Sequence, residues 1–196
     1  KQLIASIERL ISGTKIIFDD EYGNKVSTKS AEAADFYIKG THQFLGAEPG
    51  VEDSFRSAID ADPEFALAHI GYAREMQLRG RSTDMRQALD QAIKYSGNLS
   101  EREQSHLNVS SLLLSGKSTE ARLAVYEHVR RWPRDVLIAQ MCTSVFGLIG
   151  FSGLPGREAE QLSFISNLAT HYGENWWYKA QLAFAQLEVG QLNEAG

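Results

Sequence analysis

Residues Gly116–Pro133, G-K-S-T-E-A-R-L-A-V-Y-E-H-V-R-R-W-P, have the pattern of the second helix of a two-helix hairpin. Gly116 allows the preceding helix to end and the chain to reverse, because glycine adopts the left-handed backbone conformation at little cost. Ser118 or Thr119 can cap the new helix through its hydroxyl, and Pro133 stops that helix. The stretch therefore predicts a turn, a helix and a second turn.

The same landmarks recur along the chain at nearly constant spacing. The separation of Gly46 from Gly116 equals the separation of Pro63 from Pro133, and Gly190 follows Gly116 at almost the same separation. Half of this separation is close to the period of about 34 residues that defines the tetratricopeptide repeat. The spacing therefore predicts an array of helical hairpins.

Several segments resemble known repeat proteins more closely. Ala58–Pro63 (A-I-D-A-D-P) is similar to the end of the second helix of a tetratricopeptide repeat, and Gly190–Ala195 (G-Q-L-N-E-A) is similar to the turn that opens one. The order of motifs over residues 20–195 resembles the tetratricopeptide repeat protein 38 family. The matching segments are residues 30–45, 50–65 with His69, Leu99–His106, Trp132–Asp135 and the apolar run that ends at Gly150.

The resemblance implies an all-α fold, in which helical hairpins form a right-handed superhelix. It does not imply any enzymatic activity, and it implies further repeats, which would make this chain a fragment. We accordingly expect an N-terminal helix and arm over residues 1–29 and a repeat domain over residues 30–196 that ends within its last repeat.

The coarse pattern predicts the following elements. Leu3, Ile4, Ile7, Leu10 and Ile11 share one face of a helix over residues 2–12. Lys15–Phe18 and Lys25–Thr28 are β-leaning runs that predict either a small hairpin or an extended arm. The expected helices are Ser30–Leu45, Val51–Ala61, Glu64–Leu78, Asp84–Tyr95 (capped by Ser82 or Asp84), Ser100–Ser115, Thr119–Trp132, Asp135–Ile149, Arg157–Tyr172, Asn175–Val189 and the first turn of one at Leu192–Gly196.

Composition and charge limit the class of partner. A net charge of −5 argues against nucleic acid, because no surplus of Lys and Arg is present to neutralise phosphates. A hydrophobic content of 43% is typical of a soluble protein. The single cysteine, Cys142, cannot form an internal disulfide and suggests a reducing compartment, so a cytoplasmic location is expected.

The segment Val136–Gly156 has no charged residue and is long enough to span a bilayer. It nevertheless contains Gln140, Thr143, several glycines and Pro155, and it lies in phase with the repeats. A helix that is apolar on all sides also suits the middle of a packed helical stack. We therefore expect a buried helix and no membrane span.

Candidate chemical sites are few. Glu103 and His106 have the spacing of metal ligands on a helix, but Ser100-x-x-Glu103 is a capping box and no second ligand pair lies nearby. The acidic run Asp19–Asn24 lacks the ligand spacing of a calcium loop and predicts a solvated turn. His69 and His128 are expected to be packed and hydrogen-bonded. We therefore expect no catalytic residue, metal or cofactor.

Two binding surfaces remain as hypotheses. The cluster Arg130, Arg131 and Arg134 at a helix end could contact an anion or an acidic peptide. The second is the concave groove that the first helices of tetratricopeptide repeats line. In the phase set by the prolines, its residues are Phe65, Tyr72, Glu75 and Met76, then Glu103, His106 and Ser110, then Thr143 and Phe146, and then Trp177 and Phe184.

This set is aromatic and apolar, so it favours a hydrophobic segment of a partner protein or the remainder of the same protein. If the phase is wrong by one residue, the same side chains are ordinary core. We thus predict a non-catalytic scaffold for protein–protein interactions. Two alternatives stay open: the chain is part of a larger enzyme whose catalytic residues lie beyond residue 196, or it is a self-association module that forms homo-oligomers.

Overall fold

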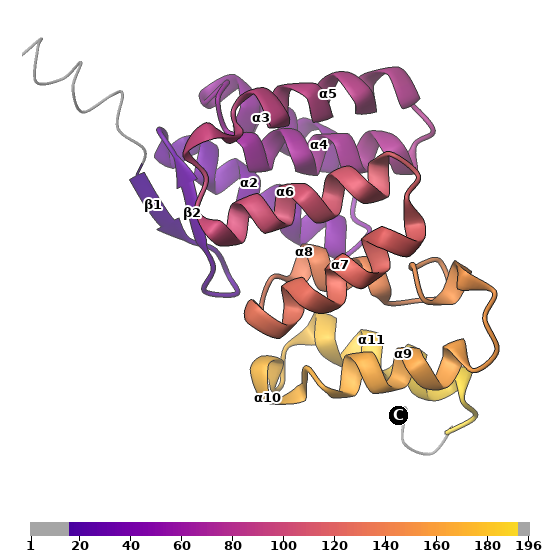
Figure 1. The fold of residues 1–196 in the computed structure, drawn as a ribbon. Helices are drawn as coiled ribbons and strands as arrows, with labels where there is room; N and C mark the ends of the chain where they lie inside the picture. The colour runs from indigo at the N-terminus through magenta and orange to yellow at the C-terminus, as the bar shows by residue number, and fades with distance from the viewer. Residues whose placement is uncertain (1–15, 192–196) are drawn as a thin grey trace, which may run out of the picture. The chain divides into compact units, whose positions relative to one another are not determined.

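A computed structural model describes residues 16–191 (Figure 1). The expected helix over residues 2–12 and the expected turn at Leu192–Gly196 lie outside the described residues. The described chain is mostly helical, as predicted. It divides between Leu107 and Asn108 into two compact units. This division falls inside the region that the sequence pattern assigns to a single repeat domain, and each unit is described by itself.

The first unit opens with a small β-hairpin, which was one of the two alternatives for this segment. Strand β1 (Ile16–Asp19) pairs antiparallel with β2 (Lys25–Thr28). In the turn, a carboxylate oxygen of Asp20 accepts hydrogen bonds from the backbone amides of Tyr22 and Asn24, at 2.9 and 2.7 Å. The acidic run therefore builds the turn itself, since a short acidic side chain satisfies backbone amides that the reversal exposes.

The helices of the first unit follow the hairpin as consecutive antiparallel neighbours. α2 packs against α3, α3 against α4, and α4 against α5. Their bounds are α2 (Ala31–Leu45), α3 (Val51–Ala61), α4 (Ala66–Leu78), α5 (Ser82–Lys94), a short 3₁₀ turn η1 (Ser96–Asn98) and α6 (Glu101–Leu114), which runs past the division between the units.

The core of this unit is centred on Phe55, whose side chain is fully buried. Two glycines face its ring: Gly40 of α2 and Gly71 of α4. A methyl group on Gly71 would lie 2.5 Å from Cε1 of Phe55, and one on Gly40 would lie 3.0 Å from its Cδ1. The ring therefore occupies space that these two helices leave open by lacking side chains at these positions.

Glycine turns close several helices in the same way. Gly80, Gly116 and Gly190 have positive φ angles between 71° and 81°. The residue after each donates its amide to a carbonyl five residues earlier: Arg81 to Met76, Lys117 to Leu112, and Gln191 to Gln186. This is the Schellman arrangement, in which a left-handed residue lets the last turn satisfy its own carbonyls.

The predicted hydroxyl caps at two of these turns are wrong. α5 begins at Ser82 and α7 (Ser118–Arg131) begins at Ser118, one to two residues earlier than expected. Neither helix has a side-chain cap, because the glycine turn already places Arg81 and Lys117 at the N-cap position. Ser30, for which no cap was predicted, does cap α2: its hydroxyl accepts a hydrogen bond from the amide of Ala33 at 3.2 Å.

The proline turns also repeat, as predicted. Helix α3 ends at Ala61 and α7 ends at Arg131, each two residues before a proline. In both turns the residue two positions after the proline donates its amide to the carbonyl of the residue just before the proline. These bonds run from Phe65 to Asp62 at 3.0 Å and from Asp135 to Trp132 at 3.1 Å. The same local geometry thus occurs at both of the prolines that the sequence spacing relates.

The second unit departs from the sequence prediction. Its elements after α7 are α8 (Val136–Ala139), the 3₁₀ turns η2 (Gln140–Cys142) and η3 (Gly150–Ser152), α9 (Arg157–Ser166), α10 (Ala169–Tyr172) and α11 (Trp176–Glu188). The expected continuous helix Asp135–Ile149 is therefore wrong, and the expected helix Arg157–Tyr172 is divided into α9 and α10.

Backbone conformation explains the interruption of the first of these helices. Thr143 is extended and Ser144 has a positive φ of 63°, so the chain leaves the helical path after Cys142. It folds back so that the amide of Leu148 donates to the carbonyl of Met141 at 2.7 Å. Within the described residues, no helix is both long enough and apolar enough to cross a membrane.

Candidate ligand-binding pocket

An open pocket of about 560 Å³ lies in the first unit, between α3, α4 and α5. We call it the Tyr72 pocket. Its lining residues are Arg56 and Ile59 of α3, His69 and Tyr72 of α4, and Asp84, Gln87, Ala88 and Gln91 of α5. Its volume falls in the range of roughly 300–1,000 Å³ that is usual for binding sites, and its wall combines hydrogen-bonding groups with a small apolar floor.

Helix periodicity explains why α5 supplies half of this wall. Asp84, Gln87, Ala88 and Gln91 are separated by three, one and three residues, so they lie on one face of the helix. The adjacent face carries Met85, Leu89 and Ala92, which are buried. The two amide side chains, Gln87 and Gln91, are therefore one turn apart and face the pocket.

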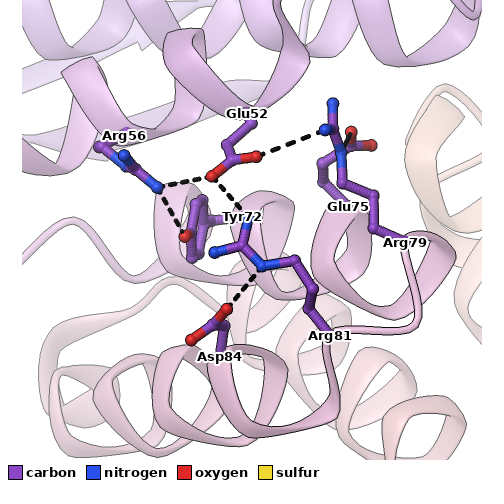
Figure 2. A network of polar contacts seen from close by, with 7 residues as sticks. All are labelled: Glu52, Arg56, Tyr72, Glu75, Arg79, Arg81 and Asp84. Carbon is purple, nitrogen blue, oxygen red and sulfur yellow. Dashed lines mark hydrogen bonds and ion pairs between the residues drawn. The ribbon is translucent and has the colours of Figure 1, made fainter.

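A single carboxylate, that of Glu52 in the first turn of α3, organises the charged rim of the pocket (Figure 2). One of its oxygens lies 2.6 Å from Nη2 of Arg56 and 2.8 Å from Nη1 of Arg81, and the other lies 3.5 Å from Nη1 of Arg79. Because Arg79 ends α4 and Arg81 begins α5, this carboxylate links the ends of three helices.

Each of these arginines has a second partner (Figure 2). Arg56 donates to the hydroxyl of Tyr72 at 3.1 Å, and Arg81 contacts Asp84 at 2.7 Å. Arg79 contacts Glu75 at 2.6 Å. Hydrogen bonds to Glu52 and Asp84 raise the pKa of Arg81 above its ordinary value. Three cations are thus matched by three carboxylates, so the rim carries no net charge.

The inner end of the pocket is closed by His69, which is buried as predicted. Its Nε2 lies 2.9 Å from the carbonyl oxygen of Pro63, and its ring stacks on that of Tyr95 with centroids 5.9 Å apart. Since a carbonyl oxygen only accepts, Nε2 carries the proton. Burial lowers the pKa of His69, against a smaller raising effect of the Pro63 hydrogen bond and of Asp62.

Because the pKa of His69 is lowered in the folded chain, we expect protonation of His69 to reduce the free energy of unfolding at acidic pH. The unfolded chain binds a proton near the ordinary pKa of 6.5, whereas the folded chain binds it only at lower pH, so the stabilising contribution of neutral His69 is complete above about pH 6.5 and is lost below it. We expect His69→Gln to flatten the dependence of the unfolding free energy on pH below about 6.5. Urea denaturation at several pH values measures this slope.

The exposed His171 provides the matched control for that measurement. His171→Gln should leave the slope of the wild-type chain unchanged, because an exposed side chain has no burial to lose on unfolding. Equal slopes for the wild-type chain and for His69→Gln would contradict the prediction.

The structure places most of the predicted groove residues in the core. The buried ones are Phe65, Glu75, Met76, Glu103, His106, Ser110, Thr143 and Trp177. Phe146 and Phe184 are exposed, at 81% and 56%, and Tyr72 is half-buried. A buried side chain contacts no partner in this conformation, so the burial favours the alternative of ordinary core for these eight. Tyr72 is the one member of the set that lines the pocket.

Glu103 and His106 lie in the buried part of α6 rather than in an open site. Glu103 is a cap, as predicted: its carboxylate accepts from the amide and the hydroxyl of Ser100, at 2.9 and 2.8 Å. It also accepts from the amide and the hydroxyl of Ser27 in β2, at 2.9 and 3.1 Å. Among residues 16–191, no group of three or more His, Cys, Asp or Glu side chains could hold a metal ion.

The arginine cluster at the end of α7 has local partners. Arg130 pairs with Glu127 at 2.7 Å, and the guanidinium of Arg131 lies 4.3 Å from the ring centroid of Trp132. The nearby His128 is fully buried, with its Nε2 3.2 Å from a carboxylate oxygen of Asp135. These contacts are those of a helix end that is stabilised from within the chain.

Sequence reasoning missed most of the Tyr72 pocket. Arg56, Asp84, Gln87 and Gln91 lie on the second helices of their hairpins, whereas the tetratricopeptide resemblance directed attention to the first helices. The polar stripe on α5 is visible in the sequence as an i, i+3, i+7 spacing, and it could have been found. The contact between Arg56 and Tyr72 joins residues 16 apart and leaves no such pattern.

Comparison of the chain with protein-family models, with curated proteins and with solved structures found no match.

Proposed function

We propose that the chain is a non-catalytic interaction module that binds an extended segment of a partner protein at the Tyr72 pocket. The observation that carries the proposal is the pair of amide side chains one turn apart on α5, beside an aromatic ring and a small apolar floor. A glutamine amide both donates and accepts, so Gln87 and Gln91 can each hydrogen-bond a peptide C=O and a peptide N–H.

The charges support a neutral, hydrogen-bonding ligand over a strongly charged one. Arg56 and Asp84 face the pocket, but each is already paired, with Glu52 and Arg81. An anionic ligand would have to displace these partners. A peptide backbone offers donors and acceptors without net charge, and an apolar peptide side chain would contact Ile59, Ala88 and the ring of Tyr72.

The proposal also covers how the helices are arranged. We propose that the helices form a superhelix of the tetratricopeptide type. Two recurring turn geometries support it: the glycine turns at Gly80, Gly116 and Gly190 close α4, α6 and α11, and the matching turns after Asp62 and Trp132 close α3 and α7. In this proposal the chain uses the surface of α3 and α5 for binding, in addition to or in place of the concave groove.

The test is selection of peptides from a random library on the wild-type chain, followed by affinity measurement by fluorescence polarisation. We expect Tyr72→Ala, and the double change Gln87→Ala with Gln91→Ala, each to weaken a selected peptide by about tenfold or more, which corresponds to about 1.4 kcal/mol. Tyr72→Phe should weaken it less, because the ring remains while the hydroxyl that accepts from Arg56 is lost.

Leu123→Ala is the control, since Leu123 of α7 is exposed and lies outside the pocket. It should bind the selected peptides as the wild-type chain does. Equal affinities for all of the variants, measured while circular dichroism shows intact helices, would refute the Tyr72 pocket as the binding site.

A further inference from the structure

The β-hairpin has two outer edges, and the chain itself satisfies one of them. Side chains bond two of the outward groups of β2: Nη2 of Arg102 donates to the carbonyl of Lys25 at 2.7 Å, and the carboxylate of Glu103 accepts from the amide of Ser27 at 2.9 Å. Next to the strand, Asp62 accepts from the amide of Lys29 at 2.8 Å. These side chains stand where a further strand would have to pair along β2.

The edge of β1 differs. In the turn, the amide of Asp20 donates to the carbonyl of Asn24 at 3.0 Å. Asp20 and Asn24 are thus a hydrogen-bonded pair, and such pairs alternate with non-bonded pairs along an antiparallel ladder. Phe18 and Ile16 therefore direct their backbone groups toward β2, and Ile17 directs its amide and carbonyl outward. No residue of the described chain bonds to these outward groups of Ile17.

The side chains along β1 are apolar and exposed. Ile16 is 46% exposed and Ile17 is 63% exposed. The charged residue that ends the strand, Asp19, is paired with Lys25 of β2 at 2.7 Å, which offsets its repulsion of another strand. An apolar strand whose outward backbone groups have no partner among residues 16–191 is a template for pairing with another strand.

We infer that β1 pairs edge to edge with β1 of a second copy of the chain. An antiparallel pairing about a two-fold axis at Ile17 joins the amide of each Ile17 to the carbonyl of the other. It also sets Ile16 of each copy opposite Phe18 of the other, so apolar residues face apolar residues.

This pairing would convert two hairpins into one four-stranded sheet with β2 at both edges, where side chains already cover the backbone. The proposal is independent of peptide binding at the Tyr72 pocket, because none of the pocket residues belongs to the hairpin. A symmetric pairing of this kind closes on itself and stops at the dimer.

The test is the molecular mass in solution as a function of concentration, by sedimentation velocity and light scattering. The wild-type chain should shift from its monomer mass of 21.8 kDa toward twice that value as concentration rises. Ile17→Lys should remain monomeric, since it sets two ammonium groups opposite each other. Ile17→Pro should also remain monomeric, because it deletes the outward donor and leaves the bonds of Ile16 and Phe18 to β2 in place.

Leu123→Lys is the matched control, because Leu123 has the same 63% exposure as Ile17 but lies on α7. It should dimerise like the wild-type chain. Hydrogen exchange adds a local readout: the amide of Ile17 should gain protection as the wild-type chain is concentrated. A wild-type chain that stays monomeric, or a dimer that survives both Ile17 variants, would overturn the inference.

Discussion

Replacing Gly71 with alanine is expected to lower the free energy of unfolding by about 3 kcal/mol, the upper end of the usual cost of overpacking a core. The added methyl group would lie 2.5 Å from Cε1 and 2.6 Å from Cζ of Phe55. That ring is fully buried and cannot move into solvent. Alanine is favoured over glycine in a helix by only about 1 kcal/mol, which is too little to offset the collision.

Thermal unfolding measures this effect, and a chain of this size should lose roughly 6–12 °C in Tm. Two further variants identify the cause. Phe55→Leu removes the ring atoms that collide, so Gly71→Ala should cost less in that background than in the wild-type chain. Gly97→Ala should change little, because a methyl group there would meet no atom within 4 Å. Additive costs for Phe55 and Gly71 would contradict the steric explanation.

A second large effect is expected at Glu103, where alanine should cost about 3 kcal/mol of unfolding free energy. The wild-type carboxylate is fully buried and accepts four hydrogen bonds, two from Ser27 and two from Ser100. Alanine would leave the amides of Ser27 and Ser100 without their acceptor. An unsatisfied buried donor costs about 1–3 kcal/mol, and most of the loss is expected at the half-buried Ser27 because Ser100 is exposed. Glu103→Gln should be intermediate, since it keeps one acceptor oxygen.

Chemical denaturation measures the total cost, and hydrogen exchange at the amide of Ser27 measures the local one. Glu120→Ala is the matched control, because Glu120 also lies in the first turn of a helix but is exposed. It should change the unfolding free energy by only a few tenths of a kcal/mol, the value of a charge near a helix end. If exchange at Ser27 stays as slow in Glu103→Ala as in the wild-type chain, the hydrogen bonds from Ser27 to Glu103 do not stabilise the hairpin.

Features that depend on neighbours in the sequence were predictable. The reversal at Gly116, the proline turns and the capping box of Ser100 and Glu103 each involve residues close to one another along the chain. The hairpin strands were also visible, because two β-leaning runs flank a turn-forming segment. In these places local chemistry and tertiary structure favour the same conformation, so the sequence pattern is sufficient.

Two other features were not predictable, one from an apolar composition and one from contacts between distant residues. The segment after Cys142 has the apolar composition of a helix, but Ser144 takes a positive φ and Gly147 packs where a methyl group would lie 2.2 Å from the carbonyl oxygen of Thr143. The rim of the Tyr72 pocket depends on Glu52 and Arg81, which are 29 residues apart.

The bond between Ser27 and Glu103 has a consequence for how the protein is made. Ser27 leaves the ribosome 76 residues before its partner, which corresponds to roughly 4–15 s at ordinary rates of synthesis. During that interval the amide and hydroxyl of Ser27 lack the acceptor that they have in the finished chain, and the hairpin lacks the side chains that close its second edge. We therefore expect chaperones that bind exposed strands to bind this nascent chain best before α6 has emerged.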